Sequence, residues 1–60
     1  RLVINEKNAI IIDYKTGHSS PSYENQLREY GQVMHRAGYQ VKEAFLVYLR
    51  EEIEVVSINI

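Results

Sequence analysis

The chain has 60 residues, a net charge of −1 and no cysteine. A domain of this length buries only about 60% of the surface that its unfolded chain exposes, and without cysteine it has neither a disulfide nor a thiolate metal site to add stability. The chain has seven basic and eight acidic residues. This balance does not give the strongly basic surface expected of a protein that binds nucleic acid without help from other domains.

The bulk properties also bear on context. No apolar run is long enough to cross a membrane, and the lack of cysteine fits a reducing cytoplasm. The chain opens with residues 1–4, Arg-Leu-Val-Ile, a pattern typical of the interior of a strand. We therefore expect an excised piece of a longer, cytoplasmic chain, stabilised by the rest of that chain or by self-association with a second copy.

A β-hairpin is predicted first. Residues 1–5 are a short apolar stretch, residues 6–8 are a polar turn, and residues 9–15 contain three consecutive isoleucines. A run of β-branched residues favours a strand over a helix. Since apolar side chains fall on both faces of the second strand, we expect it to be covered on both sides.

A helix follows the loop at residues 16–22. Ser20 is the predicted N-cap, Pro21 the first helical residue, and Gly38 the residue that ends the helix. Gly31 costs on the order of 1 kcal/mol relative to alanine and allows close packing on the sheet. The predicted core-facing side of the helix consists of Tyr23, Gln26, Leu27, Tyr30, Val33, Met34 and Ala37.

Two further strands complete the chain. Residues 40–42 lead into an apolar strand at 44–49, a polar break follows at 50–52, and a last strand is predicted at 53–60. The strand–helix–strand step requires a crossover and makes the two strands that it joins parallel. The predicted fold is α/β: a single partial domain at 1–60, the core of a larger domain, with a mixed β-sheet and one long crossover helix in the order β-β-α-β-β.

An Asp-x-Lys pair lies at the end of the isoleucine-rich strand. The strand period of two places Asp13 and Lys15 on one face, with Cα atoms roughly 6.5–7 Å apart, and Tyr14 on the other. The carboxylate is an oxygen ligand suited to Mg²⁺, and the ammonium can offset charge on a phosphate. The same pair also fits a solvated strand end in a small interaction domain, with a surface ion pair worth about 0–1 kcal/mol.

A second motif lies on the following helix, where Gln26 and Tyr30 are four residues apart and share one side. The strand that ends in Asp-Tyr-Lys-Thr-Gly (residues 13–17), together with this Gln-x-x-x-Tyr helix, resembles the PD-(D/E)XK nucleases of the RecB-like kind. The resemblance covers nearly the whole chain and is similar to the C-terminal nuclease module of helicase-nuclease proteins. It implies a restriction-endonuclease-like core.

The resemblance also implies roles for individual residues. Asp13 would be a metal ligand, the main-chain carbonyl of Tyr14 a second one, and Lys15 the catalytic lysine. Gln26 and Tyr30 would lie near the site and contact DNA or support the lysine. The intact parent would be a Mg²⁺- or Mn²⁺-dependent (exo)deoxyribonuclease of DNA repair or recombination, within a larger helicase-nuclease chain.

One ligand of the family is not found in these residues. The family has another acidic residue on the preceding strand, and by alignment it would fall just before Arg1. We therefore expect the 60-residue chain itself to bind metal weakly and not to cut DNA. The net charge of −1 also leaves open a nuclease-like fold kept as a non-catalytic DNA-binding or structural module.

Other polar and aromatic residues allow more than one role. Tyr30 could be a core aromatic and Gln26 a solvated or capping amide. A loop histidine such as His18 is more often solvated than a ligand, and His35 lies off the apolar side of the helix. Core packing is favoured over base stacking for three tyrosines, Tyr23, Tyr39 and Tyr48. A solubilising turn is favoured over a second metal site for the acidic cluster of Glu51, Glu52 and Glu54.

Overall fold

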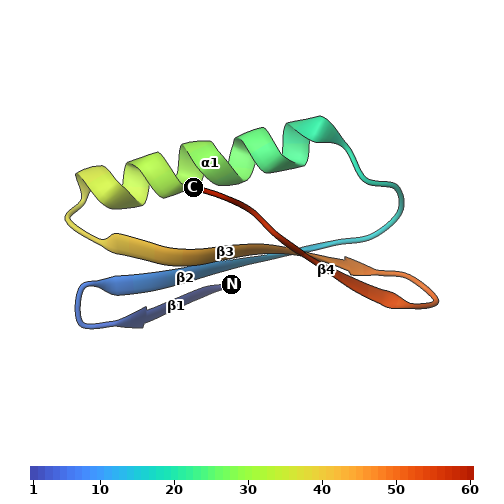
Figure 1. Ribbon diagram of the computed structural model, residues 1–60, viewed down its shortest axis with the longest axis horizontal. Helices are drawn as coiled ribbons and strands as arrows, with labels where there is room; N and C mark the ends of the chain where they lie inside the picture. Colours follow the sequence, from blue (N-terminus) through green and yellow to red (C-terminus); the bar gives the residue numbers. More distant parts are fainter.

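The computed structural model describes residues 1–60 as a four-stranded mixed sheet with one helix (Figure 1). The strands lie side by side in the order β1-β2-β3-β4. The elements are β1 (Leu2–Asn5), β2 (Asn8–Lys15), α1 (Pro21–Arg36), β3 (Gln40–Leu49) and β4 (Ile53–Ser57). The predicted α/β class and the order β-β-α-β-β are confirmed.

Short connections join the antiparallel strands of the sheet, and one long connection joins the two parallel strands. β1 pairs with β2, and β3 with β4, in antiparallel hairpins that have short polar turns. β2 and β3 are parallel, so the chain must return to the same end of the sheet between them. Figure 1 shows α1 making this return over the sheet. The predicted crossover is confirmed.

Both ends of α1 are set by residues at its boundaries. Ser20 is the N-cap, and its hydroxyl accepts a hydrogen bond from the Ser22 N–H at 3.4 Å, while Pro21 occupies the first turn. Gly38 has φ +96°, the left-handed conformation that commonly follows a helix. These predicted boundaries are confirmed. α1 is also neither long nor apolar enough to cross a membrane.

The core lies between α1 and one face of the sheet. Ala9 and Ile11 of β2 face Ala44, Leu46 and Tyr48 of β3 on that side. The helix contributes Leu27, Gly31 and Met34. The predicted helix side is therefore only partly right, because Tyr30 and Val33 are 45% and 56% exposed. The buried side of the helix passes through Gly31, which has no apolar side chain. The apolar pattern in the sequence therefore indicated the nearby residues Tyr30 and Val33 instead.

The C-terminal segment leaves the sheet and approaches the helix (Figure 1). β4 ends at Ser57, so the strand predicted to reach residue 60 is too long. Ile58 is buried and its N–H donates to the Ala44 carbonyl at 2.8 Å. A Cβ placed on Gly31 would lie 2.9 Å from Cγ2 of Ile60. The close approach at Gly31 is thus to this segment rather than to the sheet.

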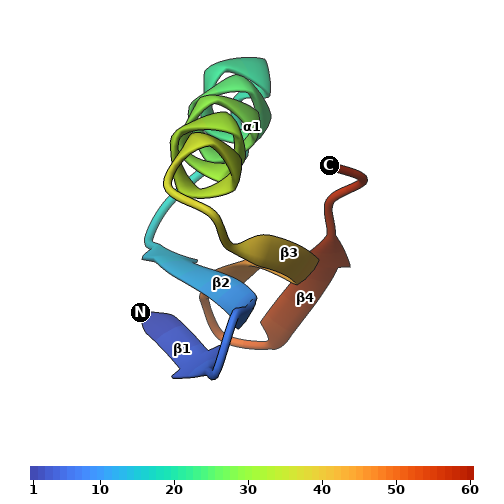
Figure 2. The same ribbon diagram turned by 90° about the vertical axis from the view of Figure 1, so that its left-hand side faces the viewer.

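The other face of the sheet carries no helix, as the turned view makes plain (Figure 2). Strand alternation and the pairing registers place a set of apolar side chains on this open face. Ile53 and Val55 are 69% and 60% exposed there. The prediction that β2 is covered on both sides is wrong within these residues. The open face consists of Val3, Ile10, Ile12, Tyr14, Phe45, Val47, Leu49, Ile53 and Val55.

Two leucines of β3 test where the stabilising core lies. Leu46 is 0% and Leu49 44% exposed. We expect Leu46→Ala to lower the free energy of unfolding by about 2–5 kcal/mol, because it leaves a cavity under α1. Leu49→Ala, on the open face, should lower it by less than about 1 kcal/mol. Urea unfolding followed by circular dichroism measures both. Equal losses would mean that both faces of the sheet contribute alike.

Candidate functional site

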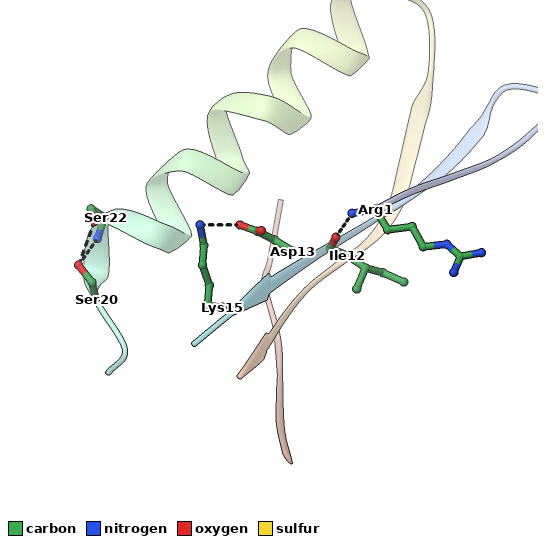
Figure 3. Close-up of polar contacts among 6 residues, drawn as sticks. All are labelled: Arg1, Ile12, Asp13, Lys15, Ser20 and Ser22. Atoms are coloured by element: carbon green, nitrogen blue, oxygen red, sulfur yellow. Dashed lines mark hydrogen bonds and ion pairs between the residues drawn. The ribbon is translucent and has the colours of Figure 1, made fainter. Parts of the chain in front are cut away.

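Asp13 and Lys15 lie at the end of β2, on the face covered by α1. The Lys15 Nζ is 3.3 Å from Oδ2 of Asp13. Figure 3 shows the two side chains turned toward each other, with the lysine reaching toward the first turn of α1. Tyr14 points to the open face and is 50% exposed. The predicted common face of Asp13 and Lys15 is confirmed.

The register explains why this pair is only partly covered. Asp13 pairs with Leu46 and Lys15 with Tyr48, and both of these β3 partners are buried. The charged side chains therefore lie on the covered face of the sheet, at the end near the start of α1, where the helix covers them only in part. Lys15 and Asp13 side chains are 26% and 35% exposed. An ion pair at such a depth contributes about 0–1 kcal/mol to stability.

Tyr23 is the third member of this cluster. The Lys15 Nζ lies 4.7 Å from the centroid of the Tyr23 ring, within range of a cation–π interaction. Tyr23 is half-buried and packs against the core, as the sequence predicted. Its contact with the lysine was not predicted. The contact could have been inferred from the position of Tyr23 in the first helical turn, one short loop after Lys15.

An open hollow of about 450 Å³ lies beside Asp13, between the start of the chain, β2 and α1. Its lining residues are Arg1, Leu2, Ile11, Ile12, Asp13, Gln26, Leu27 and Tyr30. Asp13 and the two helical residues singled out from the sequence thus meet in one place. Lys15 is not part of the lining and reaches this group through Asp13. Tyr30 is 45% exposed, so it is not a core aromatic.

Backbone pairing closes one side of the hollow. The amino group of Arg1 donates to the Ile12 carbonyl, and the Ile12 N–H donates to the Arg1 carbonyl at 2.7 Å. Figure 3 shows this contact next to Asp13. Residue 1 therefore lies against β2, next to Asp13.

The set of possible metal ligands is small. No three His, Cys, Asp or Glu side chains come together as a group that could hold a metal ion, and that includes Glu51, Glu52 and Glu54. His18 and His35 are exposed. Mg²⁺ usually keeps several waters and binds through one or two carboxylates and a substrate phosphate. At this strand end the Asp13 carboxylate is not accompanied by two further acidic or imidazole side chains.

Arg50 fixes the loop that follows Lys15. Its Nε donates to the Gly17 carbonyl at 2.9 Å, and its guanidinium lies 4.6 Å from the Tyr48 ring centroid. Gly17 has φ +83°, so this turn favours glycine. The interaction joins the loop to the end of β3. No local pattern marks it, because Arg50 and Gly17 are distant in sequence.

Comparison with known proteins adds no family assignment. No protein-family model matches the chain, and no match is found among curated proteins or solved structures. Function is therefore argued from the chemistry of the site.

The Arg50 contact can be tested by loop dynamics. Arg50→Leu removes the donor to Gly17, and we expect the ¹⁵N–¹H nuclear Overhauser effects of residues 16–19 to fall toward values typical of flexible backbone. Arg36→Leu, at the exposed end of α1, is the matched control and should leave the loop unchanged. If Arg50→Leu leaves these values unaltered, the loop is held by other contacts.

Proposed function

We propose that the chain is the catalytic core segment of a metal-dependent DNA nuclease of the PD-(D/E)XK, RecB-like kind. One observation carries the proposal. A carboxylate and an ammonium lie side by side at a strand end, and the carboxylate lines a hollow with Gln26 and Tyr30. Two motifs that are separate in the sequence thus converge, which supports a shared role. In this proposal the sheet and helix are the core of a restriction-endonuclease-like domain.

Lys15 and Asp13 have distinct roles in this hypothesis. The Lys15 ammonium orients the attacking water and offsets the negative charge that grows on the phosphate. Asp13 and the Tyr14 carbonyl would hold Mg²⁺ or Mn²⁺. When bound, the ion lowers the pKa of a water molecule and draws charge from a phosphoryl oxygen. Gln26 and Tyr30 contact the DNA strand from the helix side of the hollow.

The Asp13–Lys15 contact supports weak metal binding by this chain alone. At 3.3 Å the ammonium already occupies one side of the carboxylate, so a cation that binds Asp13 meets a neighbouring positive charge. The negative charge of a bound phosphate would relieve that repulsion. We infer that the ion is held firmly only with substrate and with the further acid of a longer chain, here proposed to be a cytoplasmic helicase-nuclease of DNA repair or recombination.

A second candidate is a nuclease-like module that binds DNA or supports a larger assembly without cutting. Two observations favour it: the net charge of −1 and the absence of a three-membered acidic or histidine cluster. The two candidates differ in whether Lys15 affects chemistry or only stability. Cleavage assays on a longer chain that contains these residues separate them.

Lys15→Ala in that longer chain should reduce DNA cleavage by at least about 100-fold, because a donor to the transition state is lost. DNA binding, measured by fluorescence anisotropy, should change little. Lys42→Ala removes an exposed lysine of β3 and serves as the control, with cleavage retained. Cleavage that survives Lys15→Ala would assign Lys15 to the structural ion pair alone.

Metal binding can be tested in the 60-residue chain by Mg²⁺ titration followed through amide chemical shifts. We expect weak binding at residues 13–15, its loss in Asp13→Asn, and several-fold tighter binding in Lys15→Met, which removes the competing charge. Glu54→Gln, an exposed acid, is the control. The same chain with Mg²⁺ or Mn²⁺ should not cut DNA. Shifts that persist unchanged in Asp13→Asn would refute the assigned ligand.

A further inference from the structure

Lys15 has two neighbours of different chemistry. Its Nζ lies 3.3 Å from the Asp13 carboxylate and 4.7 Å from the centre of the Tyr23 ring. A lysine has a flexible four-carbon stem and a compact charge, so one partly covered ion pair leaves its position loosely defined. The Tyr23 ring is the second support, and it comes from a different element of the fold.

Tyr23 is itself held in place. Ser20 caps α1 and Pro21 sets its first turn, and the Tyr23 N–H donates to the Ser20 carbonyl at 3.0 Å. The ring packs against the core. The backbone of Tyr23 is thus held by the helix start, and its ring, packed on the core, faces the lysine. Figure 3 shows the Lys15 side chain extended toward this turn of the helix.

The ring also suits a reactive ammonium better than a second carboxylate would. An aromatic face attracts a cation through its quadrupole and carries no formal charge, so the ammonium keeps its net positive charge. It also occupies none of the three N–H donors of the lysine in a conventional hydrogen bond. The lysine is thus restrained by the ring, while the donors that do not face Asp13 stay available to an incoming anion.

We propose that Tyr23 is the positioning residue of the site: its ring face fixes the Lys15 ammonium beside Asp13. This inference rests on the proposed nuclease function for its catalytic consequence. Its geometric part stands independently, because it concerns two side chains of this chain and is measurable without DNA or metal. Tyr23 acts through Lys15 and contacts no reacting atom in this proposal.

The chain contains a natural control. Lys7 lies over the ring of Tyr39 at 5.3 Å, in a similar pair near the β1–β2 turn, at the opposite end of the sheet from the site. Tyr39 is also half-buried and packs against the core. Tyr39→Leu therefore reproduces the general effect of losing a packed tyrosine, without touching Lys15.

The geometric test uses nuclear magnetic resonance on the 60-residue chain. The ring should shift the ε-CH₂ protons of Lys15 upfield and give Overhauser contacts between these protons and the Tyr23 ring. Tyr23→Phe should retain the upfield shift and Tyr23→Leu should abolish it, whereas Tyr39→Leu should leave it intact. Lys15 protons at random-coil positions in the wild type overturn the inference, and so does a shift that survives in Tyr23→Leu. If Tyr23→Leu does not fold, the wild-type and Tyr23→Phe spectra decide.

The catalytic test uses a cleavage-competent longer chain. Tyr23→Leu should lower kcat roughly threefold to thirtyfold with little change in KM, as expected for one cation–π interaction, while Tyr23→Phe and Tyr39→Leu stay near wild type. Unchanged kcat in Tyr23→Leu overturns the positioning role while leaving the nuclease intact. An upfield shift that behaves as expected, in a longer chain that never cuts DNA, removes the nuclease proposal and leaves the side-chain geometry standing.

Discussion

The parallel pairing of β2 with β3 is the constraint on which the rest of the structure depends. Two parallel strands cannot be joined by a tight turn, so α1 must carry the chain back, and in doing so it covers one face of the sheet. The same pairing brings the end of β2, the start of α1 and the end of β3 to one end of the molecule. Lys15, Tyr23 and Arg50 lie at that end because of topology, although Arg50 is distant from the other two in sequence.

Stability alone gives little reason for a charged pair at this place. Asp13 and Lys15 occupy positions whose partners on β3 are buried apolar residues, and an ion pair at this depth contributes only about 0–1 kcal/mol. The Lys15 ammonium instead contacts a carboxylate and an aromatic ring, and that carboxylate borders a hollow. Residues that do not serve stability often mark functional positions. The proposed function is based on such a feature, the Asp13–Lys15 pair beside the hollow.

Local signals in the sequence were enough to predict the elements and their order. Three isoleucines, a Ser-Pro helix start and Gly38 each encode a backbone preference within a few residues. The strand period also predicted that Asp13 and Lys15 share a face. The predictions that failed concern tertiary choices. The buried row of α1 passes through Gly31, which has no apolar side chain to mark it, and β4 ends early because Ile58 turns toward the helix.

The candidate site was predictable to the same extent. Asp13, Gln26 and Tyr30 were placed near one another by a family resemblance, and all three line one hollow. The contacts of Tyr23 with Lys15 and of Arg50 with Gly17 depend on how α1 and β3 end relative to β2. Beyond the short loop that separates Tyr23 from Lys15, no spacing within one segment encodes such contacts, so they emerge only when the chain is folded.

The open face of the sheet has a thermodynamic consequence. The accessible surface is 4500 Å² for a chain of 7.0 kDa, whereas a folded monomer of this mass typically exposes about 4,000 Å². Apolar side chains that are already hydrated in the native state, such as Ile53 and Val55, add little to the heat capacity of unfolding. Calorimetry should therefore give a heat-capacity change below the usual value of about 12–15 cal/mol/K per residue, and the stability of this chain should vary only gently with temperature.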